Sequence, residues 1–379
     1  MSTRPSSTSQ SRWRRFTSRL LVGLGAFALS LGLAELVARA FLPAPILEQG
    51  QFLPYVHMLH ENPRLRYVLR PNARATIQYP ATRNTDGFAV EYAINSLGWR
   101  DRERTRQKSP GTVRVAFLGD SITLGIGVQC EQNFAALLEG MWQRRHLDCK
   151  IEALNCGVYG YDTKQELAAY DASVMAMQPD LVVLVFFVND VEPVQFDEAT
   201  APTAYRWIRN LGLSESGTGS WSRPLSKLIP AARRYSHLAR VASALSFNAL
   251  RTRALEAGMR RNFKPASPGW RKFQAALAKL QERTRANGAQ LQVAIHPYLR
   301  ALNASYGWES EELRVLELCR KLGITCHEFH ARYPKTDKRR WFVHPFDAHP
   351  NAAAHAIFAE FLDGTLGSEI ASLCARSGE

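Results

Sequence analysis

Several metal and cofactor signatures are missing from this sequence of 379 residues. Its six cysteines form no C-x-x-C pair, and their spacings fit no zinc ribbon or finger. It has no glycine-rich phosphate loop, and no set of His, Asp and Glu shows a metal-binding spacing. These absences argue against the common zinc modules and nucleotide-phosphate loops. We predict a chain that works without a metal or cofactor, and leave open whether its cysteines pair or are buried singly.

Acidic residues are scarce in one part of the chain. The whole sequence has 48 Lys and Arg against 34 Asp and Glu, a net charge of +14. Residues 201–300 hold 18 Lys and Arg but only three acids, which gives this window +15 and leaves the remainder nearly neutral. An evenly basic surface is therefore excluded, and one basic segment needs an explanation.

The N-terminus combines a basic flank with an apolar segment. Residues 1–19 contain five arginines and no acid, and residues 20–42 are mostly apolar. A helix of that length rises about 34 Å, enough to cross a hydrocarbon core of about 30 Å. The positive flank should stay in the cytoplasm, which places the chain from residue 43 onward outside. A signal peptide cleaved at the A-x-A site at residues 38–40 and a buried soluble helix are the alternatives.

From residue 113 onward, short apolar segments alternate with segments of helical periodicity. This alternation predicts an α/β fold of three layers (flavodoxin-like), with helices on both faces of a five-stranded parallel sheet. The five predicted strands are residues 113–119, 150–155, 180–188, 290–297 and 324–329. In such sheets the active site lies beyond the carboxyl ends of the strands.

The pattern divides the chain into successive parts. They are the basic flank 1–19, the anchor or signal 20–42, a β-rich flank 43–112, the α/β domain 113–366 with a basic helical insertion 197–268, and a tail 367–379. The insertion reads as a helical subdomain with a solvated arginine face, as a lid, as a helix lying on anionic lipid, or as a cleft rim for an anionic polysaccharide. Export would remove nucleic acid as its partner.

Polar clusters follow the predicted strands and together supply the parts of acyl-transfer catalysis. Ser121 stands at a strand-to-helix turn, where it could act as a nucleophile. His349 could accept the serine proton, and Asp347 could hold the imidazole in the required tautomer. Backbone N–H groups and the Asn189 side chain could form an oxyanion hole. Each cluster alone is typical of an ordinary turn or helix cap. Their occurrence together, in order and at successive strand ends, favours a catalytic site.

With these clusters in place, the sequence resembles the SGNH hydrolases, also called the GDSL esterase/lipase superfamily, over residues 113–366. The first block matches at Gly119-Asp120-Ser121 and the second at residues 155–163. The resemblance implies a nucleophile, two oxyanion-hole residues, an acid and a base, which are Ser121, Gly160, Asn189, Asp347 and His349, with the Ser121 N–H as the third oxyanion donor.

Two positions depart from the family pattern. Phe187 stands where the third block usually has glycine, and the last block reads Asp-x-His in place of Asp-x-x-His. The shortened spacing leaves a dyad of Ser121 and His349 as an alternative to the triad. Weaker candidates for the catalytic site are His296, His344 and His355.

The resemblance, with the N-terminal segment and the Asn-x-x-Gly-Trp-Arg motif at residues 95–100, is to anchored bacterial members of the superfamily. We therefore expect a single-pass protein of the bacterial inner membrane with a periplasmic serine esterase domain. Its partners would be the membrane and a small acyl ester or an acylated glycan or lipid of short acyl chain. The alternatives are an O-acyltransferase acting on a cell-envelope polysaccharide and a non-catalytic glycan-binding scaffold.

Overall fold

The computed structural model describes residues 7–41, 56–81, 86–146, 148–191, 236–238, 256–302, 306–334, 337–345 and 347–377. These residues belong to two compact units. One unit contains the N-terminal helix, and the other contains the central sheet and everything that surrounds it. Most of the predicted insertion, residues 197–268, lies outside the described residues.

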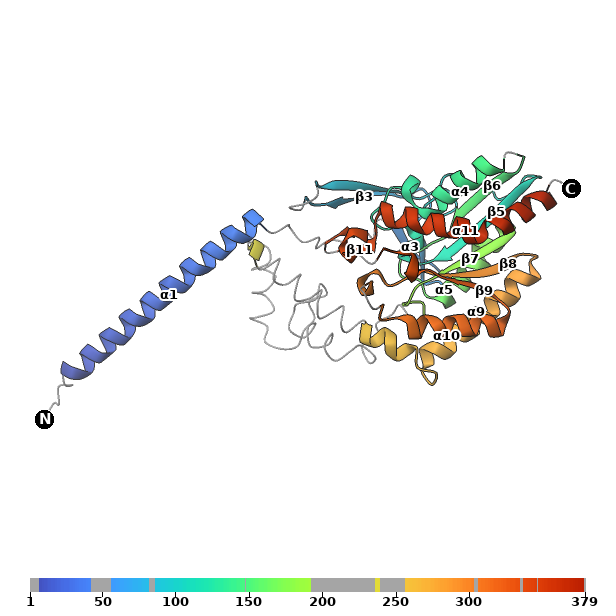
Figure 1. The fold of residues 1–379 in the computed structure, drawn as a ribbon. Coiled ribbons are helices and arrows are strands. Elements are labelled where there is room, and N and C mark those ends of the chain that lie inside the picture. The colour runs from blue at the N-terminus through green and yellow to red at the C-terminus, as the bar shows by residue number, and fades with distance from the viewer. Residues whose placement is uncertain are drawn as a thin grey trace. The chain divides into compact units, whose positions relative to one another are not determined.

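The N-terminal helix α1 runs over Ser7–Phe41 without interruption (Figure 1). Its segment Phe16–Phe41 has a mean hydropathy of 2.1 and is long enough to cross a membrane. The structure thus supplies one helix with the length and composition of a membrane anchor or a signal sequence.

The larger unit is built on a five-stranded parallel sheet of order β6-β5-β7-β8-β9, as predicted. Its strands are β5 Thr112–Gly119, β6 Lys150–Asn155, β7 Leu181–Phe186, β8 Gln290–Ile295 and β9 Thr325–Glu328. β5 and β7 are buried along their whole length because helices cover both faces of the sheet. Continuous apolar runs at these places are what made the strands visible in the sequence.

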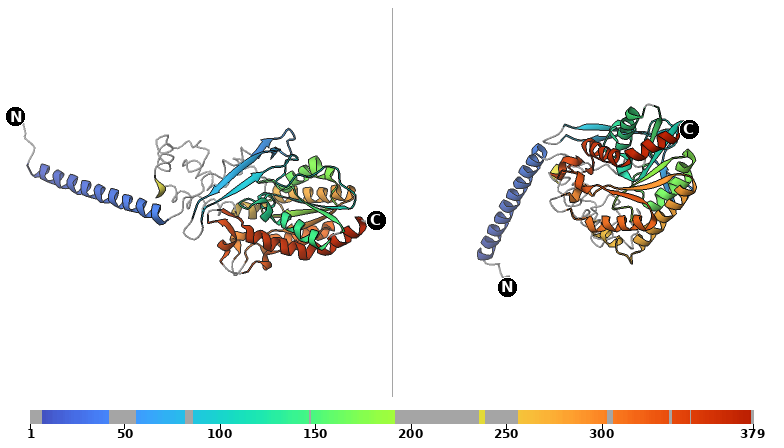
Figure 2. Two further views of the ribbon diagram at one scale, coloured as in Figure 1. Left: turned by 90° about the horizontal axis from the view of Figure 1, so that it is seen from above. Right: turned by 45° about the vertical axis from the view of Figure 1, so that its right-hand side comes forward.

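Helices form two layers around the sheet (Figures 1 and 2). One face carries α4 and α11, and the other carries α5, α9 and α10. Their bounds are α4 Phe134–Arg145, α5 Thr163–Ala169, α9 Pro268–Ala286, α10 Glu309–Leu322 and α11 Ala352–Ser377. Short helical turns complete the unit at Ser121–Leu124 (α3), Cys130–Gln132 (η1), Tyr170–Val174 (η2, a π-helix), Met175–Met177 (η3), Leu299–Ala301 (η4), His330–Arg332 (η5) and Lys338–Trp341 (η6).

Three small antiparallel pairs flank the sheet. Two lie in the β-rich flank, β1 His57–Leu59 with β2 Tyr67–Leu69 and β3 Arg74–Tyr79 with β4 Phe88–Ala93. The third pairs β10 Phe342–His344 with β11 Asp347–Pro350. β11 carries the predicted acid and base, so the site is partly built by a strand outside the main sheet.

A disulfide joins Cys149 to Cys374, two cysteines that are 225 residues apart in the chain. It connects the segment just before β6 to the last turns of α11, which continues past residue 366 to Ser377. The other four cysteines, Cys130, Cys156, Cys319 and Cys326, form no disulfide. Cysteine pairing was left open by the sequence because local spacing carries no signal for so distant a partner.

Candidate active site

Ser121 lies at the tight turn where β5 ends and α3 begins. The Asp120 carboxylate caps α3 by accepting the Ile122 N–H at 2.9 Å. Gly119 has no room for a side chain, because a Cβ there would lie 2.2 Å from Thr123 Oγ1. α3 has only four residues and ends at Gly125 in the left-handed conformation. The turn therefore fixes the position of Ser121, while so short a helix contributes little dipole.

The three predicted members of the triad are brought together in hydrogen-bonding sequence. Ser121 Oγ lies 2.9 Å from Nε2 of His349, and Nδ1 of His349 lies 2.6 Å from Oδ1 of Asp347. Since Nδ1 faces the carboxylate and carries the proton, Nε2 is free to accept the serine proton. This is the geometry that nucleophilic activation of a serine needs.

The short Asp-x-His spacing is explained by β11. Residues i and i+2 of a strand point to the same side, so Asp347 and His349 can face each other without the additional residue. The Asp347 carboxylate also accepts the His349 N–H at 3.1 Å and the Tyr79 hydroxyl at 3.2 Å. The extended strand thus brings the carboxylate to Nδ1 of the histidine with one intervening residue in place of the usual two.

The charges of this pair are mutually stabilised. Burial opposes ionisation of Asp347, but the charge of His349 and its hydrogen bonds outweigh burial and lower the pKa of Asp347. Burial also opposes protonation of His349, but the charge and hydrogen bond of Asp347, with the charge of Asp120, raise the pKa of His349. The arrangement therefore favours the imidazolium that forms when the serine proton is transferred.

Asn189 follows β7 and is held by the residue that precedes the nucleophile. Its Nδ2 donates to Oδ2 of Asp120 at 2.9 Å, which uses one of its two amide hydrogens. Asp190 closes the same turn by accepting the Phe187 N–H at 2.9 Å. Asp120 thus orients the Asn189 side chain and caps the serine turn at once.

The two glycines of the second block have different surroundings. The Gly157 N–H donates to Oδ1 of Asn155, and a Cβ on Gly157 would lie 2.3 Å from the Leu124 nitrogen. Gly157 is therefore required for packing against α3. Gly160 has a left-handed φ of 73°, and its N–H has no acceptor among the described residues. The free N–H suits Gly160, rather than Gly157, to the predicted role in an oxyanion hole.

Two residues of the β-rich flank support the site and were missed by the sequence analysis. Tyr79 binds Asp347 as described, and Arg100 is fully buried beneath the serine turn. The Arg100 guanidinium donates to the carbonyls of Leu124, Gly125, Glu91 and Val128, and it lies 3.9 Å from the centre of the Tyr92 ring. The Asn-x-x-Gly-Trp-Arg motif, which contains Arg100, was the available signal.

Of the weaker histidine candidates, His344 lies beside the triad, since it pairs with Asp347 across β10 and β11 and its ring lies 6.2 Å from that of Tyr79. His296 and His355 lie elsewhere in the core. His296 is buried, and Phe187 packs against its ring and that of Tyr298 at centroid distances of 6.3 and 5.9 Å. Burial lowers the pKa of both His296 and His355 to about 3, so both stay neutral. The aromatic side chain of Phe187 thus packs on two residues that directly follow β8.

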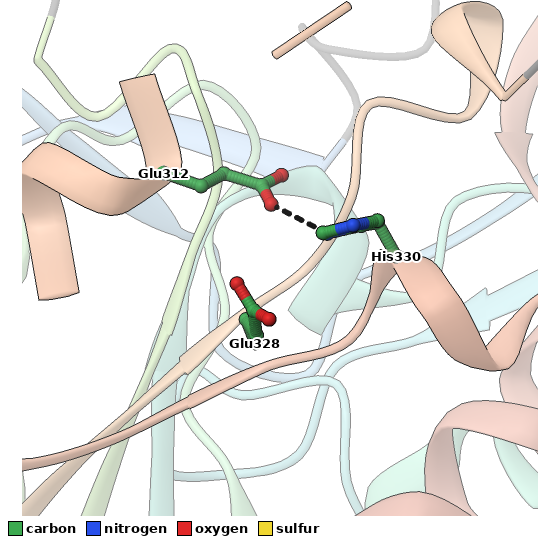
Figure 3. Close-up of side chains that lie close together, drawn as sticks. All are labelled: Glu312, Glu328 and His330. Carbon is green, nitrogen blue, oxygen red and sulfur yellow. Dashed lines mark hydrogen bonds and ion pairs between the residues drawn. The ribbon is translucent and has the colours of Figure 1, made fainter. Parts of the chain in front are cut away.

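One group among the described residues could hold a metal ion. Donor atoms of Glu312, Glu328 and His330 lie within 4.8 Å of one another, and their side chains converge from α10, β9 and η5 (Figure 3). His330 Nδ1 already forms a 3.0 Å hydrogen bond with Glu312, and its ring stacks on Tyr306. Two members of the group are thus already joined by a hydrogen bond, and none of the three belongs to the triad.

Comparison with known protein families gives one match. The model of the GDSL-like lipase/acylhydrolase family matches residues 117–357. No curated protein sequence matches the chain.

Solved structures show similarity at low sequence identity. A two-domain esterase active on acetylated mannans is 15% identical, with 68% of this chain and 49% of that chain covered and a TM-score of 0.40. The chain thus spans about half the length of that esterase. The acetylxylan esterase Axe2 from Geobacillus stearothermophilus is 15% identical, with 66% and 92% covered and a TM-score of 0.39. TesA is 18% identical, with 67% and 97% covered and a TM-score of 0.39.

Proposed function

The chain belongs to the GDSL-like lipase/acylhydrolase family and is an ester hydrolase by class, and we propose that it is an extracytoplasmic serine esterase that uses Ser121, His349 and Asp347. The observation that carries this proposal is the continuous hydrogen-bonded series from Ser121 Oγ through the imidazole to the Asp347 carboxylate. The contacts at the ring nitrogens of His296, His327 and His330 do not combine a serine with a carboxylate in this way.

The reaction follows from the positions of these groups. Ser121 Oγ attacks the acyl carbon while its proton passes to His349 Nε2. The carbonyl oxygen becomes an oxyanion, which the Ser121 and Gly160 N–H groups and the second amide hydrogen of Asn189 would stabilise. His349 then returns the proton to the leaving alcohol, which leaves Ser121 acylated. Water, deprotonated by His349, attacks the acyl group and releases the acid and free serine.

Two features favour a place outside the cytoplasm. The apolar segment Phe16–Phe41 suits an anchor or a signal sequence that follows a basic flank. The disulfide between Cys149 and Cys374 fits an oxidising compartment, because cytosolic thiols are kept reduced. Both observations support a periplasmic catalytic domain.

A charged, membrane-impermeant fluorophosphonate probe tests activity and location together. We expect it to label Ser121 in spheroplasts without lysis. We also expect Ser121→Ala to lose the label and at least about 10³-fold in kcat/KM on 4-nitrophenyl acetate. Ser173→Ala is the matched control, because Ser173 is partly buried and donates only to the Ala169 carbonyl. Retention of turnover by Ser121→Ala would refute the mechanism, and labelling only after lysis would refute the location.

A further inference from the structure

Four basic residues lie beside the strand that carries the catalytic pair. We call Arg300, Lys338, Arg339 and Arg340 the basic rim. The Lys338 ammonium donates to the Arg300 carbonyl, which joins η4 to η6. Asn351, two residues after His349, donates its side-chain N–H to the Arg340 carbonyl at 2.8 Å. The rim is therefore tied to the C-terminal end of β11.

Arg300 is the member whose position relative to His349 is best defined. It follows β8, whose neighbour β7 leads to Asn189, so it belongs to the same carboxyl edge as the other site residues. Its guanidinium carbon lies 5.8 Å from the centre of the Phe342 ring. Phe342 pairs with Pro350, the residue next to His349. The charge of Arg300 is near enough to lower the pKa of His349, against the stronger opposing effect of Asp347.

The charge of the rim is not neutralised by the acids around it. Within the described part of the chain, none of its four side chains forms an ion pair with a carboxylate. Asp337 uses Oδ1 to cap the Arg339 backbone N–H. Glu256 forms its hydrogen bond with the Tyr298 hydroxyl rather than with a cation of the rim. Four cations without paired acids at a catalytic edge call for an anionic ligand.

The side of the site on which the rim lies indicates which part of the substrate carries this anion. The acyl oxygen must face the N–H groups beside Ser121, whereas the leaving oxygen must face His349 Nε2, which protonates it. The rim is attached to the strand of His349. The alcohol part of the ester is therefore the part that extends toward the rim.

We propose that the basic rim, with Arg300 foremost, binds a carboxylate or phosphate on the alcohol part of the substrate. This inference rests on the proposed esterase function and adds the substrate class, an O-acylated anionic alcohol such as an acidic sugar or a sugar phosphate. A guanidinium is suited to either anion because its N–H groups match two oxygens at once.

Three matched esters test the rim. They are the 3-O-acetyl ester of methyl glucoside, the same ester of its uronate, and the same ester of its 6-phosphate. For Arg300→Gln we expect kcat/KM to fall about tenfold further on the anionic esters than on the neutral ester, the size of a lost charge-assisted hydrogen bond. Which anionic ester is affected more distinguishes a carboxylate from a phosphate. Raising the salt to 1 M should shrink the preference, since the Debye length falls to about 3 Å.

Arg332→Gln is the matched control. Arg332 is exposed, whereas Arg300 is half-buried, but each guanidinium lies over a phenylalanine ring at a similar distance, 5.7 Å from Phe361 for Arg332 and 5.8 Å from Phe342 for Arg300. Arg332→Gln should leave the ratio of anionic to neutral activity at the wild-type value. The double variant Arg339→Gln/Arg340→Gln changes two exposed side chains and covers the case in which Arg300→Gln does not fold. It should reduce the ratio by about threefold, as expected for exposed charges.

The pH profile separates binding of an anion from a merely structural effect. Loss of the Arg300 charge should raise the pKa of His349, so the acid limb of kcat/KM on the neutral ester should move to higher pH. Equal losses on all three esters in a folded Arg300→Gln would overturn the proposal. If the wild type hydrolyses none of the esters and lacks the fluorophosphonate label, it is the esterase function that fails.

Discussion

Two histidine–carboxylate pairs occur in the same unit, and only one of them has a serine at its second nitrogen. His349 binds Asp347 at 2.6 Å and faces Ser121 with Nε2. His330 binds Glu312 at 3.0 Å, and its Nε2 faces the Glu309 carboxylate at 3.8 Å. A histidine–carboxylate pair is therefore not by itself a catalytic feature. It can activate a nucleophile only where a group such as the Ser121 hydroxyl faces the second ring nitrogen.

The two carboxylates also differ in the form that their surroundings favour. Asp347 receives donors from His349 and Tyr79, and the charge of His349 helps to lower its pKa against burial. Burial raises the pKa of Glu312 to about 7, although hydrogen bonds from Tyr306 and His330 act against this rise. The surroundings of Asp347 therefore favour its charged form, whereas burial favours the neutral form of Glu312.

The largest expected effect is on activity when each carboxylate is replaced by its amide. Asp347→Asn removes the acceptor that fixes the Nδ1–H tautomer, so we expect kcat to fall by about 10³ to 10⁴-fold. Glu312→Gln is the matched change in the other pair and should alter kcat by less than about twofold, within the effect of a substitution remote from the reacting atoms. Steady-state hydrolysis of 4-nitrophenyl acetate measures both. Near-normal turnover by Asp347→Asn would mean that Ser121 and His349 work as a dyad.

A second prediction concerns Asp120, which holds the Asn189 side chain beside the His349–Asp347 pair. Asp120→Asn would set an amide group against Nδ2 of Asn189, so the oxyanion donor would lose its orientation. We expect kcat to fall about 10²-fold, which is the usual effect of losing one oxyanion-hole donor. The cap of α3 should survive because asparagine is also a good N-cap residue. A large loss of thermal stability together with unchanged kcat would show that Asp120 is structural only.

The sequence analysis succeeded where the signal was local. The alternation of short strand-like segments with helical segments located all five strands of the sheet to within a few residues, and polar residues at their carboxyl ends included Ser121 and Asn189. The Asp-x-His spacing could be judged only once β11 was known to be a strand, since in a strand two residues suffice to bring the side chains together.

The parts that were missed depend on distant contacts. Tyr79 meets Asp347 across 268 positions of the chain, and a tyrosine in a β-rich flank carries no sign of such a partner. The disulfide partner of Cys149 is equally invisible from spacing. The motif at residues 95–100 marked the neighbourhood of Arg100, but not that its guanidinium is buried and donates to carbonyl oxygens of distant segments.

The smallest expected effect is on stability, and it tests the second pair directly. A pKa of about 7 for Glu312 in the folded protein lies above the usual 4.5, so below pH 4.5 the group is protonated whether folded or unfolded. Between pH 4.5 and 7 the unfolded chain loses this proton first, and stability falls as pH rises, by at most about 3 kcal/mol. Glu312→Gln cannot lose a proton, so its melting temperature should fall less than that of the wild type between pH 5 and 8. Glu309→Gln, in which the changed side chain is 60% exposed, is the control and should follow the wild type. Parallel curves for Glu312→Gln and the wild type would show that Glu312 is ionised in the folded protein, and the two pairs would then differ only in what their second nitrogen faces.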